Sequence, residues 1–161
     1  MEPTFAALHS LSTPLKILVI DDEPSIRQVL CQALEMDGHQ IYEASDGVIA
    51  VHLFAVARPD LVLLDIILPK KDGLHVLQDI RRLDNKVGVI VMSALTPDRL
   101  TIRSTLSTAD SYLQKPFSLK LLYMHIQYVM KKARLRYPEP RWQELVTNGY
   151  HKRHDNSSLQ N

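Results

Sequence analysis

The fold is decided by residues 61–73, which read Leu-Val-Leu-Leu-Asp-Ile-Ile-Leu-Pro-Lys-Lys-Asp-Gly. The first four residues form a continuous apolar run, which is typical of a strand buried on both faces of a parallel sheet. A carboxylate, Asp65, follows this run directly. The stretch therefore predicts a central buried strand with an acidic group at its carboxyl end.

Short apolar runs alternate with helical repeats on either side of this strand. Strands are expected at 16–20, 40–44, 61–64, 87–92 and 111–113, and helices at 24–37, 48–57, 74–80, 97–106 and 118–134. Regular alternation predicts an α/β fold, a doubly wound five-stranded parallel sheet in a single domain with short terminal extensions. Right-handed crossovers then put the ligand crevice at the carboxyl ends of the strands, where the strand order reverses.

Composition limits the classes of function. The 161 residues carry 19 Lys and Arg against 18 Asp and Glu, so the net charge of +1 argues against nucleic acid or an anionic membrane as a partner. One cysteine excludes an internal disulfide framework and a multi-cysteine zinc site. The longest uncharged apolar run, 47–57, is far shorter than the ~20 residues that span a bilayer. We expect a cytoplasmic protein without a membrane segment.

Three regions follow from composition and charge. Residues 1–14, rich in Ser, Thr and Pro, predict a flexible leader, and 15–136 the folded domain. Basic residues dominate after residue 130, and prolines follow at 138 and 140. Residues 137–161 are therefore expected to be a short basic tail, with a possible helix at 140–147.

Three carboxylates fall where strands are expected to end. Asp21 and Asp22 follow the run 17–20, and Asp65 follows 61–64. Two such charges about 4 Å apart repel by roughly 4 kcal/mol at an effective dielectric constant near 20, so a shared proton or a cation must offset them. Hard oxygen ligands in an open cluster suit Mg²⁺. Each aspartate alone could instead cap the following helix, but capping is a poor explanation for all three.

Two further side chains reach the same edge of the predicted sheet. Ser93 follows the fourth strand and Lys115 the fifth. A carboxylate nucleophile, a divalent cation, a hydroxyl and a lysine together suit phosphoryl transfer, because that chemistry depends mostly on positioning and charge neutralisation. Taken singly, Ser93 is more typical of a turn and Lys115 of a surface salt bridge.

These motifs resemble those of the receiver domain of bacterial two-component response regulators. The resemblance runs from about residue 15 to 134 and includes Asp21-Asp22, the stretch 65–73, Ser93-Ala94 and Tyr112-Leu-Gln-Lys115-Pro116-Phe117. It implies a flavodoxin-like fold with strand order 2-1-3-4-5. It also implies that Asp65 accepts a phosphoryl group from a histidine kinase or a phosphotransfer protein.

The same resemblance implies a magnesium site. Asp22, Asp65 and the backbone carbonyl of Ile67 would bind Mg²⁺ directly, while Asp21 would act through water. Lys115 would neutralise the phosphoryl oxygens.

The resemblance also implies a switch. The peptide bond between Lys115 and Pro116 would be cis. Ser93 would close on the phosphoryl group while Tyr112 turns inward. That paired movement would change a protein-interaction surface.

The sequence departs from the family pattern at two places near the end of the domain. The usual glycine before strand five is absent from 108–112, which reads Thr-Ala-Asp-Ser-Tyr. The last helix carries Leu121 and His125 where many DNA-binding members carry a Glu and an Arg that pair two copies. We therefore do not expect that ion-paired dimer.

Two helices are unusually apolar on their expected outer faces. No charge appears in 47–57, where Val48, Ile49, His52, Ala55, Val56 and Ala57 occupy the outer positions. In 118–134, Leu121, Tyr123, Met124 and Tyr128 flank the core stripe. Large exposed apolar patches are uncommon on monomers. We expect one or both faces to be covered by a target protein, a second copy or the terminal extensions, unless a few apolar residues simply lie at the surface.

The leading interpretation is a phospho-accepting signalling module without its own DNA-binding domain, which binds a target protein or passes phosphate onward in a relay. One alternative is the N-terminal receiver fragment of a DNA-binding transcription regulator. Another is a phosphatase or phosphotransferase, but such enzymes place a second Asp two residues after the nucleophile, where this chain has Ile67. We expect no enzymatic activity beyond the phosphorylation and dephosphorylation of its own aspartate.

Overall fold

The computed structural model describes residues 13–95 and 107–136 of the chain. Within them lie the strands β1 (Lys16–Ile20), β2 (Gln40–Ala44), β3 (Leu61–Asp65), β4 (Gly88–Ser93) and β5 (Ser111–Gln114). The helices are α2 (Pro24–Met36), α3 (Gly47–Ala57), α4 (Gly73–Leu83) and α6 (Leu119–Arg136). All strand pairs are parallel, in the order β2-β1-β3-β4-β5, which confirms the predicted flavodoxin-like sheet.

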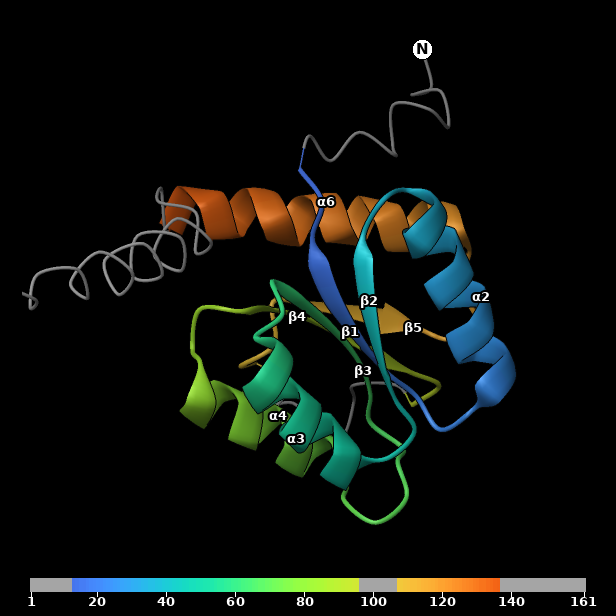
Figure 1. Cartoon of the computed structure of the whole chain (residues 1–161), viewed down its shortest axis with the longest axis vertical. Helices are drawn as coiled ribbons and strands as arrows, with labels where there is room; N and C mark the ends of the chain where they lie inside the picture. Colours follow the sequence, from blue (N-terminus) through green and yellow to red (C-terminus); the bar gives the residue numbers. More distant parts are fainter. Residues whose placement is uncertain (1–12, 96–106, 137–161) are drawn as a thin grey trace, which may run out of the picture.

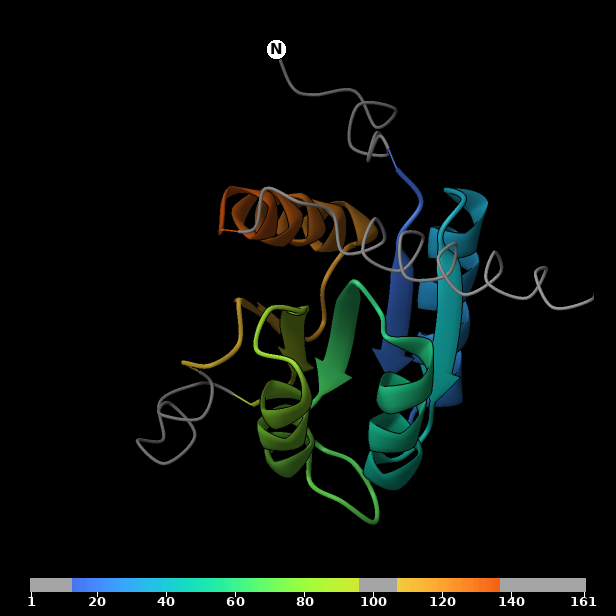
Figure 2. The same ribbon diagram turned by 60° about the vertical axis from the view of Figure 1, so that its left-hand side comes forward.

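Helices cover both faces of the sheet. α2 and α6 lie on one face, and α3 and α4 lie side by side on the other (Figures 1 and 2). The chain leaves β1 for β2 across one face and β2 for β3 across the other, so the strand order reverses between β1 and β3. This reversal opens a crevice at their carboxyl ends, as the doubly wound topology requires.

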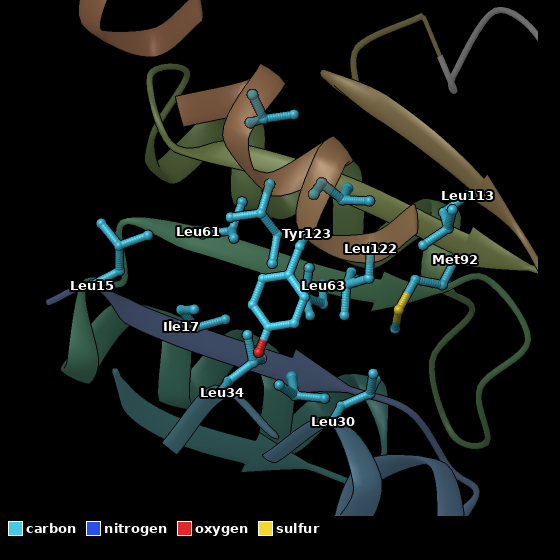
Figure 3. Packing of buried hydrophobic residues seen from close by; sticks show 14 of the residues in the cluster. Leu15, Ile17, Leu30, Leu34, Leu61, Leu63, Met92, Leu113, Leu122 and Tyr123 are labelled. Atoms are coloured by element: carbon cyan, nitrogen blue, oxygen red, sulfur yellow. The ribbon is translucent and has the colours of Figure 1, made fainter. Parts of the chain in front are cut away.

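Successive side chains along each strand point to opposite faces of the sheet and pack in two separate cores. Ile17 and Leu63 face α2 and α6, whereas Leu18 and Leu64 face α3 and α4. Every residue of β3 is buried, because helices cover both of its faces. Figure 3 shows the first core, with the ring of Tyr123 between Leu63 and Leu34.

Helix ends follow local sequence signals. Pro24 occupies the first turn of α2, where its missing N–H costs no hydrogen bond. Asp46 caps α3 by accepting from the N–H groups of Val48 and Ile49. Ser118 caps α6 as expected, its Oγ accepting from the Leu121 N–H at 3.2 Å.

Several expectations need correction. The fourth strand includes Ser93, which therefore ends β4 instead of following it, and the fifth strand extends to Gln114. Tyr123 was expected to flank the core stripe of the last helix, but it is 2% exposed because α6 also packs against α2. Leu121, Met124 and Tyr128 do lie at the surface.

Other expectations fall on residues that the structure does not describe. The leader expected at 1–14 lies almost entirely outside the described residues. The helix expected at 97–106 lies wholly outside the described residues, and so does the tail at 137–161 with its possible helix at 140–147. Among the described helices, none is both long and apolar enough to cross a membrane.

Candidate functional site

Backbone pairing brings the predicted carboxylates to one edge of the sheet. Asp21 directly follows β1, and its N–H donates to the Ala44 carbonyl at 3.1 Å, which continues the ladder to β2. Asp65 is the last residue of β3, next to β1. Asp22 lies one residue beyond Asp21 and is exposed. Each of the three offers a carboxylate oxygen, and these oxygens lie within 4.8 Å of one another.

Lys115 bridges two of these carboxylates. Its Nζ lies 2.6 Å from Oδ2 of Asp65 and 2.7 Å from Oδ2 of Asp21. The Lys115 N–H donates to the Ser93 carbonyl at 2.8 Å, so sheet pairing between β4 and β5 fixes where the lysine leaves the sheet. Both carboxylates are buried, and the lysine side chain is 15% exposed. The site therefore holds an ammonium already aimed at the candidate nucleophile.

Burial and charge act in opposite directions on the pKa values in this cluster. Burial raises the pKa of Asp65 above its ordinary value, although Lys115 and the Ile67 N–H oppose that shift. Burial alone would lower the pKa of Lys115, but its hydrogen bonds to Asp21 and Asp65 outweigh burial and the net shift is upward. The lysine is therefore a cation at neutral pH.

The residues present suit a divalent cation. Three carboxylates and one ammonium leave two net negative charges, which a divalent cation would balance. Mg²⁺ prefers oxygen ligands and usually keeps several waters, so it needs an open site. An open cleft of roughly 460 Å³ borders the cluster and is lined by Asp22, Glu23, Pro24, Asp65, Ile67, Ala94 and Lys115.

The residues predicted to form the switch are Ser93 and Tyr112, and Ser93 directly precedes Ala94, which lines the cleft. Ser93 is fully buried, and its Oγ accepts from the Leu95 N–H at 3.1 Å. The Tyr112 hydroxyl donates to the Leu95 carbonyl, so it is tied to the loop that follows Ser93. The peptide bond between Lys115 and Pro116 is cis, as expected.

The loop after β3 folds back on the site. The Gly73 N–H donates to the Ile66 carbonyl at 2.9 Å, and the Ile67 N–H donates to Oδ1 of Asp65 at 2.9 Å. A Cβ at Gly73 would lie 2.3 Å from the Asp65 carbonyl oxygen, so a side chain there would push the loop away. The glycine thus lets α4 begin against the candidate nucleophile.

Two contacts near the site escaped prediction. Arg27 of α2 donates through Nη1 to the Asp21 carbonyl at 2.8 Å. Lys70 reaches Oδ2 of Asp46 at 2.6 Å. The Arg27 contact could have been suspected, because Arg27 lies near the start of α2, only six residues after Asp21. Nothing in the sequence spacing links Lys70 to Asp46, which are 24 residues apart.

Known sequences similar to this chain are response regulators or probable transcriptional regulators. Residues 17–127 match the model of the response regulator receiver domain. The chain is 44% identical over 125 residues to a probable transcriptional regulator ycf27 of Guillardia theta, covering 76% of this chain and 48% of that protein. It is 34% identical over 120 residues to the response regulator MprA of Mycobacterium sp. (strain KMS), covering 74% and 52%. The chain thus spans about half the length of these relatives.

Solved structures with the same fold include a two-component response regulator from Clostridium difficile. That protein is 30% identical with a TM-score of 0.67, covering 72% of this chain and 95% of its own. A CheY-like receiver domain protein from Methanospirillum hungatei JF-1 has a TM-score of 0.72 at 22% identity, covering 77% and 99%, and shows the fold alone. Given the match over 17–127, the sheet order and the edge cluster of carboxylates and lysine, the chain belongs to the response regulator receiver domain family.

Proposed function

We propose that Asp65 is the phosphoacceptor of this chain, taking a phosphoryl group from a histidine kinase or a phosphotransfer protein. The observation that carries the proposal is the bridging of Asp65 and Asp21 by Lys115 at the open end of the sheet. A buried carboxylate beside a cleft, held by an ammonium, supports the proposed attack on phosphorus. The location would be the cytoplasm, where such donors are found.

The proposed reaction transfers a phosphoryl group from the donor to Asp65. A carboxylate oxygen of Asp65 forms a bond to phosphorus while the bond from phosphorus to the donor nitrogen or oxygen breaks, and the donor leaves with that electron pair. Lys115 neutralises charge on the phosphoryl oxygens. Asp21, Asp22, Asp65 and the Ile67 carbonyl would hold Mg²⁺, which supplies further charge neutralisation when bound. The chemistry would be confined to the phosphorylation of Asp65 and the later hydrolysis of the aspartyl phosphate, in which water takes the phosphoryl group and the Asp65 carboxylate is restored.

The Asp65→Asn variant tests the assignment. With acetyl phosphate and Mg²⁺, intact mass spectrometry should show one added phosphoryl group on the native chain and none on the variant, because the amide is a far weaker nucleophile. EDTA should abolish labelling of the native chain.

Asp72→Asn is the matched control, because it removes one negative charge from the same loop and asparagine caps a helix as well as aspartate does. It should be labelled like the native chain. Equal labelling of Asp65→Asn and the native chain would refute the proposal.

The output would be a changed protein-interaction surface. Ser93 and Tyr112 are candidates for the switch, because the backbone of Leu95 is hydrogen-bonded to both side chains. A target protein would bind an exposed helix face, on α3 or on α6, and a homodimer could use the same faces. A pull-down with and without beryllofluoride, a phosphoryl mimic, would identify such a target by its dependence on the mimic.

A second candidate is the receiver part of a DNA-binding regulator. It is favoured by one finding, that relatives at 34% to 44% identity are named as a response regulator and as probable transcriptional regulators and extend to about twice the matched length. Reading the coding frame beyond residue 161 distinguishes the two candidates. A fused helix-turn-helix segment would favour the second, and a stop codon would favour the first.

A further inference from the structure

The loop at 66–72 contains a lysine in a backbone conformation that favours glycine. Lys70 has φ of +64°, and the Lys71 N–H donates to the Pro69 carbonyl at 2.7 Å. This hydrogen bond joins residues two apart, so Lys70 is the central residue of a γ-turn with positive φ, which is rare and strained. Such strain persists only where surrounding contacts hold it.

The contact that holds Lys70 comes from the start of α3. Its Nζ lies 2.6 Å from Oδ2 of Asp46, the residue that caps α3. The Asp46 side chain is only 4% exposed, and its Oδ1 accepts from Val48 and Ile49 at 3.0 and 2.9 Å. The helix cap fixes this carboxylate, so it forms a rigid anchor. The stem of Lys70 lies mostly in solvent, and only its ammonium is held.

Backbone packing brings loop and helix into direct contact. A Cβ at Gly47, the first residue of α3, would lie 2.4 Å from the Lys71 carbonyl oxygen and 2.7 Å from its Cβ. The same loop starts directly after Asp65 and is closed by the hydrogen bond from Gly73 to Ile66. A shift of the loop away from α3 would therefore be transmitted to the backbone at Ile67, whose N–H binds Asp65.

We propose that Lys70 is a positioning residue for the Asp65 site, because its ion pair with Asp46 holds the 66–72 loop in the strained conformation that keeps the Ile67 amide on Asp65. This inference rests on the proposed function. Without the ion pair, the γ-turn relaxes and the loop samples other conformations. Fewer molecules then present Asp65 in the arrangement needed for phosphoryl transfer, and the rate falls.

A double-mutant cycle tests the pair. Lys70→Met keeps the stem and removes the charge, and Asp46→Asn keeps the α3 cap and removes the charge. Lys70→Arg restores the cation and should recover the native behaviour. Lys71→Met is the matched control, because it removes a positive charge from the same loop, one residue away from Lys70. The Lys71 ammonium pairs with Asp79 of α4 and not with α3.

Two readouts are needed, one of which does not involve phosphorylation. Hydrogen exchange by NMR, without phosphodonor, should be faster at the Ile67 and Gly73 amides in Lys70→Met and Asp46→Asn than in Lys71→Met. The phosphorylation rate with acetyl phosphate should fall by about threefold to tenfold in Lys70→Met and in Asp46→Asn. The rate of the double variant should be little lower than that of either single variant, because both changes break the same ion pair.

Additive losses, or losses equal to that of Lys71→Met, would overturn the proposal, as would unchanged exchange at both amides. Phosphorylation of neither the native chain nor any variant would instead refute the proposed function. The exchange data would then still decide whether the ion pair holds the loop.

Discussion

A single ammonium shared by two carboxylates determines how the site responds to added charge. Lys115 contacts Asp65 and Asp21 at nearly equal distances. Phosphorylation of an aspartate brings about −1.5 to −2 charges and three strong acceptors. Under the proposed function, Lys115 would shift toward the phosphoryl oxygens and weaken its hold on Asp21. The first effect of modification would then be a redistribution of contacts among residues already in place.

Cys31 should be an unreactive thiol. It is 5% exposed, and burial together with Glu43 and Glu35 raises its pKa from 9.0 to about 12. Because the thiolate is the reactive form, its fraction at pH 8 falls by about a thousandfold, and alkylation slows at least as much. Iodoacetamide labelling followed by mass spectrometry should show slow modification of the native chain and rapid modification in urea. Similar rates in both conditions would contradict the burial of this side chain.

Sequence reasoning placed the charged residues at strand ends but missed the ion pair of the loop. Asp21 and Asp65 were predictable because each directly follows an apolar run, and Lys115 because it follows the short strand β5; parallel strands end at a common edge. The contact of Lys70 with Asp46 depends on a positive φ, which sequence patterns assign to glycine and not to lysine. Loop contacts of this kind become visible only in coordinates.

At the scale of elements, one hydroxyl joins two helices. Tyr123 of α6 is buried, and its hydroxyl donates to the Asp37 carboxylate and lies 3.2 Å from the Ala33 carbonyl at the end of α2. Its pKa is raised by burial and by Asp37, so it remains a neutral donor. The spacing of apolar residues in α6 predicted that Leu122 faces the core, but it did not predict the contact of Tyr123 with α2. Such a spacing shows which face of a helix is buried against the sheet and does not show whether a second helix packs beside it.

Tyr123→Phe should lower the free energy of unfolding by about 1 kcal/mol, because a buried hydrogen bond to a carboxylate is lost. Urea titration followed by circular dichroism measures the change. Tyr128→Phe is the control, since Tyr128 lies on the same helix and is 57% exposed. Equal effects of the two variants would show that the hydroxyl contact contributes nothing.

The apolar surface of α3 can be tested without unfolding the helix. Val48, Ile49 and Val56 are 57%, 40% and 71% exposed, and nothing in the described residues covers them. Ile49→Glu places a carboxylate in the first turn, where the helix dipole favours it, and Val56→Lys places a cation in the last turn. The thermal midpoint of the isolated chain should therefore stay the same or rise slightly.

If a target protein or a second copy binds this face, both variants should bind it less while remaining folded. Val29→Glu on α2, which is 54% exposed, controls for the added charge. Unchanged association of all three variants, measured by pull-down and by light scattering, would leave the α3 face without a binding role.

At the scale of the whole molecule, one buried and one half-buried histidine make stability depend on pH. Burial lowers the pKa of His39, whose Nδ1 accepts from the Leu15 N–H at 3.2 Å, and burial also lowers the pKa of His125. The unfolded chain therefore binds protons more readily than the native one near pH 6. The stability present above pH 6.5, the ordinary histidine value, is lost as the pH falls below it.

Urea titrations at pH 7.5, 6.5 and 5.5 should show this loss, and His39→Asn should reduce it, because the amide oxygen can accept the same hydrogen bond without titrating. His75→Asn serves as the control, since His75 is exposed. A pH dependence that is identical in the native chain and in His39→Asn would assign the effect to other groups.

The two cores on opposite faces of the sheet have a consequence for how this molecule tolerates change. Leu63 and Leu64 are neighbours in sequence, yet one packs under α6 and the other under α4, with the backbone of five strands between them. A cavity opened on one side has no access to side chains on the other, so the opposite layer cannot relax to fill it. Paired substitutions, one per layer, should thus add in their cost, and each side of the protein is free to diverge on its own.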